Sequence, residues 1–419
     1  MSEMAKNKYF FPLIMVTSLF FMWGFVHNLD PILIPHLKKS FSLTTLQSSL
    51  VDSSVFIAYL LMALPAGYLM KRFGYKAGIL TGLLLFALGS FLFIPAANTQ
   101  LYEFFLAALF IIACGLTILE TAANPYVSLL GDPATATRRL NFAQSFNGLA
   151  ATLAPIIGAR IILTKGSSDE ELNAMTNSAR QVALASEASS VKGPYLVLGS
   201  LILIVALIFY FTRLPEIEES EEHTESKNPF HALRHNHLRW AVAAQFFYVG
   251  AQVCVFSFFI LYAVDVAGLD RVIAADYLGW GCGLAFMIGR FFGVFLMRYM
   301  LPERLLAIYS IICIVLSLMA VLASGMPTIY AVIGIAFFMS VMFPTIFSLG
   351  IKGLGRDTKF GSSLIVMSIV GGAVLPPVFA YISDVSGDIR YGHIVSTICF
   401  IVVLAFALRG HKIVKIRAS

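Results

Sequence analysis

Twelve apolar runs recur along the whole chain, and each is long enough to cross the hydrocarbon core of a membrane as a helix. A spanning helix needs about 20 mainly apolar residues. Only 12% of the residues are charged and the mean hydropathy is +0.83, whereas about a quarter of the residues are charged in soluble domains. We therefore expect an all-α membrane protein with twelve transmembrane helices, at approximately 10–36, 44–70, 77–97, 101–130, 140–163, 193–214, 238–264, 272–299, 304–324, 327–350, 360–382 and 391–409.

The basic residues predict the orientation of these helices. With the N-terminus placed in the cytoplasm, most of the 29 Lys and Arg residues fall in the terminal tails and the even-numbered loops. The positive-inside rule therefore predicts that both termini are cytoplasmic. The net charge of +6 is explained by this topology, so we expect the lipid bilayer as a partner and no nucleic acid.

A polar linker divides the helices into two sets of six. Residues 213–237 form a long polar stretch with an acidic front and a basic rear, which predicts an N-terminal half at 1–212 and a C-terminal half at 238–419. The halves share a short motif: "NPYVSLLG" has Pro125 six residues before Gly131, and "FPTIFSLG" has Pro344 six residues before Gly350. Repeated halves with a binding site at their interface are typical of transporters.

The sequence offers little support for an enzyme. It contains no nucleotide-binding loop, metal-ligand cluster or nucleophile–base motif, and its polar segments are too short for a catalytic domain. The five cysteines all lie in predicted helices without metal-ligand spacing, so we expect them to be small buried side chains rather than disulfides. No cofactor is expected.

Ionisable residues inside the predicted helices are few, and the middle of the fourth run holds Glu120. A charged group at such a depth costs at least about 2.5 kcal/mol, so it should face a cavity or a partner. Glu120 lies roughly 15 Å from the cytoplasmic end of its helix. On the next helix Gln144 and Asn147 share one face. These side chains could line a central cavity, or the amides could hydrogen-bond each other between helices.

The seventh run adds a polar and aromatic stripe. Gln245, Tyr248 and Gln252 follow one face of a helix. Amides and a phenol suit a polyhydroxylated ligand, and aromatic faces suit the C–H faces of a sugar ring. Amides that only pack helices together are the alternative here. Asn28 in the first run is a further candidate for substrate binding, and Arg290 could line the cavity or pair internally.

The segments "ILETAANPYV" and "RLNFAQSFNG", together with "WGFVHNLDPILIPHLKKSF" and "AAQFFYVGAQ", resemble the fucose–proton symporter family of sugar porters within the major facilitator superfamily. The resemblance covers essentially the whole chain. It implies the major facilitator fold, alternating access and cation-driven transport of a monosaccharide. It also implies that Glu120, Gln144 and Asn147 belong to the sugar and coupling site. A bacterial inner (plasma) membrane is the expected location.

Two departures from the family pattern leave the sugar open among hexoses or deoxyhexoses such as glucose, galactose or fucose. Fucose–proton members have a carboxylate directly before the Ile-Leu-x-Pro run, where this chain has Pro31, with Asp30 one residue earlier. Fucose-type members also have a tyrosine before the proline of the tenth run, Pro344, where this chain has Phe343.

The coupling cation is predicted to involve Glu120, Asp30 and Asp52. Asp30 and Asp52 lie at matching depth on neighbouring helices, roughly 27–30 Å from the cytoplasmic side. Two facing carboxylates can share a proton, or they can bind sodium with help from serine hydroxyls at positions 48, 53 or 54. Asp52 could also simply reach water. We favour a proton-driven symporter, with a sodium-driven symporter as the alternative, followed by a sugar sensor or an exporter of another small polar solute.

Overall fold

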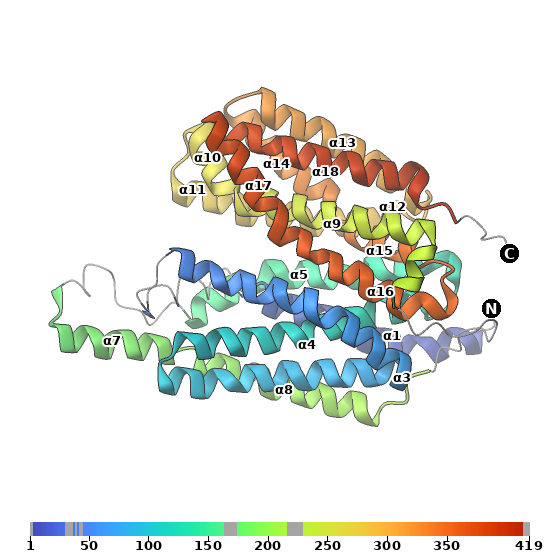
Figure 1. Cartoon of the computed structure of the whole chain (residues 1–419), viewed down its shortest axis with the longest axis horizontal. Coiled ribbons are helices and arrows are strands. Elements are labelled where there is room, and N and C mark those ends of the chain that lie inside the picture. Colours follow the sequence, from blue (N-terminus) through green and yellow to red (C-terminus); the bar gives the residue numbers. More distant parts are fainter. Residues whose placement is uncertain are drawn as a thin grey trace. The chain divides into compact units, whose positions relative to one another are not determined.

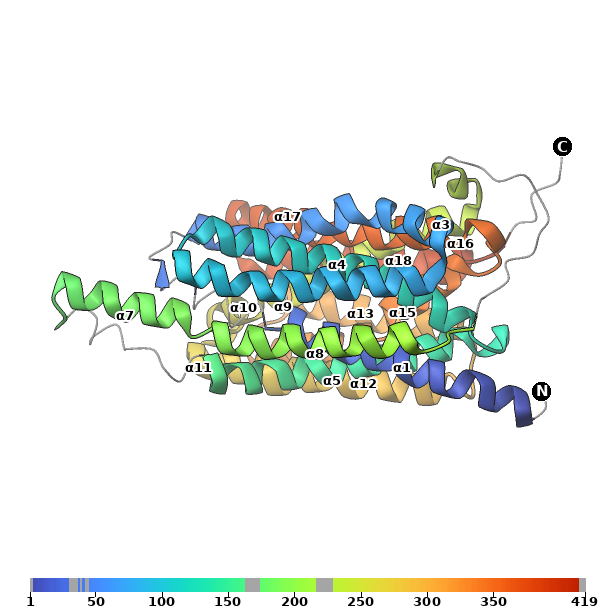
Figure 2. The same ribbon diagram turned by 90° about the horizontal axis from the view of Figure 1, so that it is seen from below.

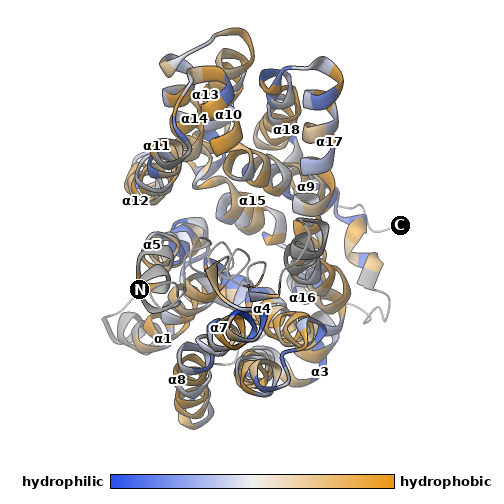
Figure 3. Cartoon of the chain, turned by 90° about the vertical axis from the view of Figure 1, so that its left-hand side faces the viewer, coloured by the Kyte–Doolittle hydropathy of each residue, from blue (hydrophilic) through white to orange (hydrophobic). Residues whose placement is uncertain are grey.

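The structure is a computed structural model that describes residues 3–29, 37, 40–41, 45–162, 174–215 and 229–413. All regular secondary structure in these ranges is helical, which agrees with the predicted all-α class. Nine helices within the described residues are long and apolar enough to cross a membrane. Orange, hydrophobic residues are present on these helices, which Figure 3 shows nearly end-on.

The nine spans account for ten of the twelve predicted runs, because one span contains two runs. The other two runs fall on two further helices. Helix α3 (Thr45–Thr99) contains two of the runs, which are joined at Gly74. Gly74 has φ 79° and ψ 173°, so the chain turns there without a Cβ to oppose it. The runs at 10–36 and 140–163 fall on α1 (Glu3–His27) and α5 (Ala136–Ile162). Each predicted run therefore falls on a helix.

The remaining helices follow the predicted order along the chain (Figures 1 and 2). Several spans are built from two helical pieces, as at the break between α14 and α15. The helices are α4 (Tyr102–Leu129), α7 (Asn177–Ser189), α8 (Lys192–Phe211), α9 (Asn236–Ser257), α10 (Phe259–Ala267), α11 (Arg271–Asp276), α12 (Leu284–Leu296), α13 (Pro302–Leu322), α14 (Met326–Met339), α15 (Met342–Ile351), α16 (Thr358–Met367), α17 (Gly371–Ser386) and α18 (His393–Ala405).

The chain forms two compact units that divide α1, α4 and α5 between them. One unit comprises Met1–Phe21, Ala123–Thr152 and Glu216–Ser419, and the other comprises Met22–Ala122 and Leu153–Pro215. These units are defined by internal packing. The division into halves at 1–212 and 238–419, with a linker at 213–237, stays a prediction.

In the unit of residues 22–122 and 153–215, α3 packs along α8 (Figure 2). The rings of Phe93 and Tyr195 stack with centroids 3.7 Å apart and an interplanar angle of 2°. At the end of α8, Lys76 Nζ donates to the carbonyl oxygens of Tyr210 and Thr212, at 2.8 Å each. A cation is favourable there because the last carbonyls of a helix lack intrahelical donors.

In the other unit, α9 packs against α15, α17 and α18. Two glycines allow this close approach. A Cβ on Gly371 would lie 2.0 Å from the carbonyl oxygen of Phe246, and a Cβ on Gly250 would lie 2.1 Å from Leu375 Cδ1. Between α13 and α18, Thr397 Oγ1 donates to Ser317 Oγ over 2.9 Å. Small residues and hydroxyl pairs are the usual means of packing helices inside a membrane.

The repeated proline–glycine motif has different local roles in its two copies. Gly131 follows α4 with φ 98°, in the left-handed region. Gly350 lies within α15, where a Cβ would come within 2.5 Å of Ala241 Cβ on α9. The first glycine ends a helix and the second permits helix packing. All five cysteines are buried and free, as predicted.

Candidate substrate and cation site

Glu120 lies in the middle of α4 and is only 8% exposed. Its Oε2 accepts a hydrogen bond from Tyr59 Oη of α3 over 3.0 Å, within one compact unit. Tyr59 is itself buried. The sequence analysis missed Tyr59, because a hydroxyl donor 61 residues away has no periodic relation to the carboxylate. Its phenol in the middle of an apolar span was the one available signal.

The hydroxyl groups of α4 are engaged within the helix. Thr117 Oγ1 donates to the Ala113 carbonyl over 2.8 Å, and Thr121 Oγ1 donates to the Thr117 carbonyl over 2.7 Å. Ser128 Oγ repeats the pattern with the Asn124 carbonyl at 3.0 Å. Such bonds to the preceding turn satisfy small hydroxyls in an apolar helix. The candidate site on α4 is therefore built on the carboxylate of Glu120 and the amide of Asn124 rather than on these hydroxyls.

Gln144 forms part of an amide pair. Its Nε2 donates to Asn124 Oδ1 over 3.1 Å, and both side chains are buried. Asn124 Nδ2 has no hydrogen-bond partner among the described residues. The bond between Gln144 and Asn124 fits the predicted alternative in which amides join two helices. That alternative does not account for Asn124 Nδ2. Asn147, three residues further along α5, is partly exposed.

Two of the three candidates on α9 are buried with unused hydrogen-bonding groups. Gln245 and Tyr248 are fully buried. Neither amide atom of Gln245, nor the hydroxyl of Tyr248, has a partner within the described part of the chain. Leaving such a group unsatisfied costs about 1–3 kcal/mol. Amides retained only for helix packing should be paired, so these groups are better suited to a polar ligand or water. Gln252 is partly exposed.

Aromatic rings accompany this set. Tyr248 meets Phe343 edge-on with centroids 6.4 Å apart, and Phe343 stacks near Phe347 at 6.4 Å. Phe343 is the position where fucose-type members have a tyrosine. An apolar ring in place of a phenol removes one hydrogen-bonding group from this side of α15.

Arg290 of α12 pairs internally, the second of the two roles left open by the sequence. It is 4% exposed, donates from Nη1 to the Gln144 carbonyl over 2.7 Å, and donates from Nε to the Ser340 carbonyl over 2.8 Å. Its guanidinium carbon lies 4.6 Å from the centroid of Phe286. Asn28, directly after α1, is partly exposed, and its Nδ2 donates to the Gly24 carbonyl over 2.6 Å.

The predicted pair of aspartates lies outside what the structure describes. Asp30 is not among the described residues, and Asp52 lies in α3 with its side chain undescribed. The same holds for the side chains of Ser48 and Ser53, so the aspartate site stays a prediction. Among the described residues, no group of three or more His, Cys, Asp or Glu side chains could hold a metal ion.

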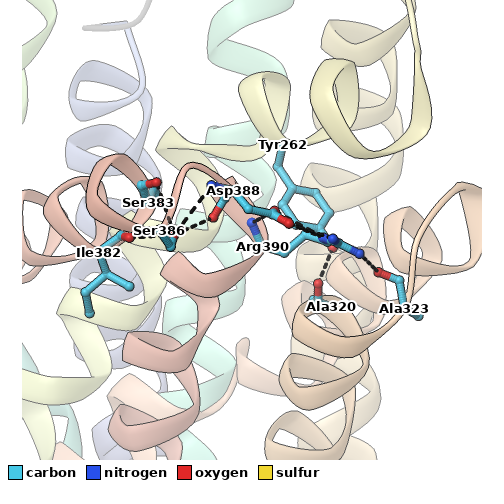
Figure 4. A network of polar contacts seen from close by, with 8 residues as sticks. All are labelled: Tyr262, Ala320, Ala323, Ile382, Ser383, Ser386, Asp388 and Arg390. Atoms are coloured by element: carbon cyan, nitrogen blue, oxygen red, sulfur yellow. Dashed lines mark hydrogen bonds and ion pairs between the residues drawn. The ribbon is translucent and has the colours of Figure 1, made fainter.

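A second polar network joins the turn after α17 to the end of α13 (Figure 4). Asp388 and Arg390 form an ion pair at 2.6 Å, and Arg390 Nη1 donates to the Ala323 carbonyl over 3.3 Å. The hydrogen bonds from Arg390 hold the pKa of the Asp388 carboxyl below its ordinary value. Tyr262 Oη donates to the Ala320 carbonyl over 2.6 Å. Each of these side chains has a hydrogen-bond partner in the network, so we assign the network a structural role.

Comparison with known proteins places the chain among transporters. The model of the family described as Major Facilitator Superfamily matches residues 13–367. The L-fucose-proton symporter of Escherichia coli is 42% identical over 411 residues, which cover 96% of this chain and 93% of the symporter. The glucose/galactose transporter of Brucella abortus is 41% identical over 410 residues, 97% of this chain and 96% of that protein. A crystal structure of the E. coli fucose:proton symporter superposes with a TM-score of 0.89 at 40% identity, over 96% of this chain and 99% of that chain.

Proposed function

Because the chain belongs to the Major Facilitator Superfamily, we propose that it is a secondary active symporter that moves a monosaccharide together with a cation by alternating access. Membership of this family makes it a transporter rather than an enzyme, as the sequence predicted. Relatives with around 40% identity over nearly the whole chain include a fucose–proton symporter and a glucose/galactose transporter. The substrate we propose is accordingly a hexose or deoxyhexose.

The observation that supports sugar binding best is the set of buried polar groups without partners. Gln245 offers a donor and an acceptor, and Tyr248 offers a hydroxyl, all shielded from water. Sugar hydroxyls both donate and accept, so they can satisfy amides and phenols together. We assign Gln144, Asn147, Asn28 and Gln252 to the same substrate set. Their proposed role rests on the family resemblance and on their positions in α5, directly after α1, and in α9.

Glu120 is the proposed coupling carboxylate. A buried carboxylate that exchanges a proton can change its charge during the cycle, which an amide cannot do. Tyr59 donates to it and thereby fixes the orientation of one carboxylate oxygen. We propose that Asp30 and Asp52 assist cation handling. A proton is favoured as the driving ion because two relatives are named as proton symporters.

We place the protein in a bacterial inner membrane with both termini in the cytoplasm. The relatives named above are bacterial, and the distribution of Lys and Arg supports the orientation. Labelling of single cysteines placed at Ser2 and Ser419 with an impermeant reagent tests it, since neither site should react from the outside of intact cells.

Counterflow in proteoliposomes tests the function. Vesicles loaded with unlabelled glucose, galactose or fucose, and diluted into the same labelled sugar, should transiently accumulate label with at least one of the three. Empty liposomes and vesicles loaded with an unrelated polar solute are the controls. Saturable sugar binding without counterflow would indicate a sensor. Neither binding nor counterflow with any monosaccharide would contradict a sugar transporter.

A further inference from the structure

Arg290 of α12 is a buried cation that the proposed transport mechanism does not use. Within the described part of the chain it forms no salt bridge, and the acceptors it has are two backbone carbonyl oxygens, those of Gln144 and Ser340. A buried charge is retained only where its surroundings compensate it. The two carbonyls and the face of the Phe286 ring, 4.6 Å away, provide that compensation.

The Ser340 carbonyl needs an external donor because of the sequence that follows it. In a continuous helix this carbonyl would accept from the N–H of residue 344, but that residue is Pro344, which has no N–H. Helix α14 ends at Met339 and α15 begins at Met342, so the carbonyl lies at the break between them. Arg290 Nε occupies this acceptor at 2.8 Å.

A glycine of α12 and a glycine of α5 show how closely α12 approaches its neighbours near Arg290. A Cβ on Gly289 would lie 2.3 Å from the Phe337 carbonyl oxygen and 2.9 Å from Ser340 Oγ, so α12 and α14 are in close contact there. A Cβ on Gly148 of α5 would lie 3.8 Å from Met287 Cα and 3.9 Å from Arg290 Nη1. The side chain of Arg290 therefore runs between α5 and the break in the α14–α15 span.

Two further bonds fix the same face of α5. Thr137 Oγ1 and Ser348 Oγ are 2.9 Å apart, and Asn141 Nδ2 donates to Thr345 Oγ1 over 3.2 Å. Residues 137, 141 and 144 follow one another at helical spacing, so they lie on one face of α5. The bond from Arg290 to the Gln144 carbonyl is the last of these three contacts along α5, and Gln144 also belongs to the amide pair with Asn124.

We propose that Arg290 is a positioning residue for sugar binding: by bridging the carbonyl oxygens of Gln144 and Ser340, it holds α5 in the register at which Gln144 meets the substrate. This inference deepens the proposed function and rests on it for the identity of the ligand. Arg290 acts through Gln144 and does not itself touch the sugar. The planar guanidinium is suited to this, because it presents several donors in a fixed geometry that a lysine lacks.

Equilibrium binding of the sugar that gives counterflow should be measured for the parent, Arg290→Met and Arg290→Lys in lipid nanodiscs. Loss of two bonds from a charged donor should weaken binding in Arg290→Met about tenfold or more. Arg290→Lys should recover part of this loss. Arg298→Met is the matched control, since Arg298 is an exposed arginine just beyond the same helix, and it should bind like the parent.

Pro344→Ala provides an independent test that leaves Arg290 in place. The new N–H at position 344 competes for the Ser340 carbonyl, so this variant should also weaken binding, and adding Arg290→Met should have little further effect. Fully additive losses from the two changes would show that they do not share a contact and would overturn the bridge.

Hydrogen exchange on sugar-free protein separates this inference from the proposed function. Backbone amides of residues 137–148 should exchange faster in Arg290→Met than in the parent, while those of α18 should not change. Unchanged exchange at 137–148 overturns the positioning role whether or not any sugar binds. If exchange rises but the parent binds no monosaccharide, the bridge stands, and the proposed function together with the sugar-positioning role fails.

Discussion

Replacing Glu120 with glutamine separates the charge of this side chain from its shape. The carboxylate is 8% exposed and accepts a hydrogen bond from Tyr59 Oη at 3.0 Å. A glutamine at this position keeps an oxygen that can accept the same bond, and it keeps nearly the same volume. What it loses is the ability to exchange a proton. The variant therefore tests coupling with little disturbance of packing.

The magnitudes favour a clear outcome. A hydrogen bond to a charged group contributes about 1.5–3 kcal/mol and one between neutral groups about 0.5–1.5 kcal/mol. Replacing a charged acceptor by a neutral one should therefore weaken this bond by about 1–1.5 kcal/mol, while the cost of burying a charge is removed. The net change in folding stability should be small beside a typical total of about 5–15 kcal/mol. Coupling free energies of about 1–3 kcal/mol correspond to roughly 5- to 150-fold effects of one ligand on the affinity of the other. In Glu120→Gln, the effect of the cation on sugar affinity should vanish.

The assay compares gradient-driven accumulation with counterflow in the same proteoliposomes. Glu120→Gln should abolish accumulation while exchange continues, because exchange needs no net movement of the cation. Tyr59→Phe is the matched control: it removes the donor but leaves the carboxylate, so accumulation should persist at a reduced rate. If Glu120→Gln accumulated sugar like the parent, the coupling role of Glu120 would be refuted.

Five other substitutions, in three sets, test the substrate amides, the aspartates and the helix packing. Asn147→Ala should weaken sugar binding by about 0.5–1.5 kcal/mol at an unchanged melting temperature, whereas Gln144→Ala should weaken binding and also lower the melting temperature, since Asn124 Oδ1 loses its donor; intact affinity in both would favour amides that only join helices. Asp30→Asn or Asp52→Asn should impair gradient-driven uptake, and normal coupled uptake in both variants would leave Glu120 as the only coupling carboxylate. Gly371→Ala should destabilise the protein by roughly 1–3 kcal/mol in thermal unfolding, because its Cβ would lie 2.0 Å from the Phe246 carbonyl oxygen; an unchanged melting temperature would contradict the close packing of α17 on α9.

Much of the fold could be predicted from the sequence because the bilayer imposes a length on every spanning helix. Each of the twelve apolar runs falls on a helix, and Gly74, between the second and third runs, has a positive φ inside α3. Glu120 and Gln245 are both buried, while their proposed roles stay predictions. Hydropathy and glycine placement are local signals, so a single sequence contains them.

The partners of the site residues could not be predicted, because they depend on packing between helices far apart in the chain. Nothing in the sequence links Tyr59 to Glu120, and periodicity alone left two roles for Arg290. The bond from Arg290 to Ser340 depends on the missing N–H of Pro344, a consequence visible only once α12 is known to lie beside that break. The matched glycines of the repeated motif also proved to differ, since Gly131 ends a helix and Gly350 packs against α9.

Sugar-dependent proton movement is the most direct test of the proposed symport. Proteoliposomes containing the protein and a pH-sensitive dye in the lumen, without a sodium gradient, receive the sugar identified by counterflow. Inward sugar movement should acidify the lumen, and Glu120→Gln should abolish this response. No pH change on sugar addition, combined with sugar accumulation that requires an inward sodium gradient, would contradict proton-coupled symport and identify sodium as the driving ion.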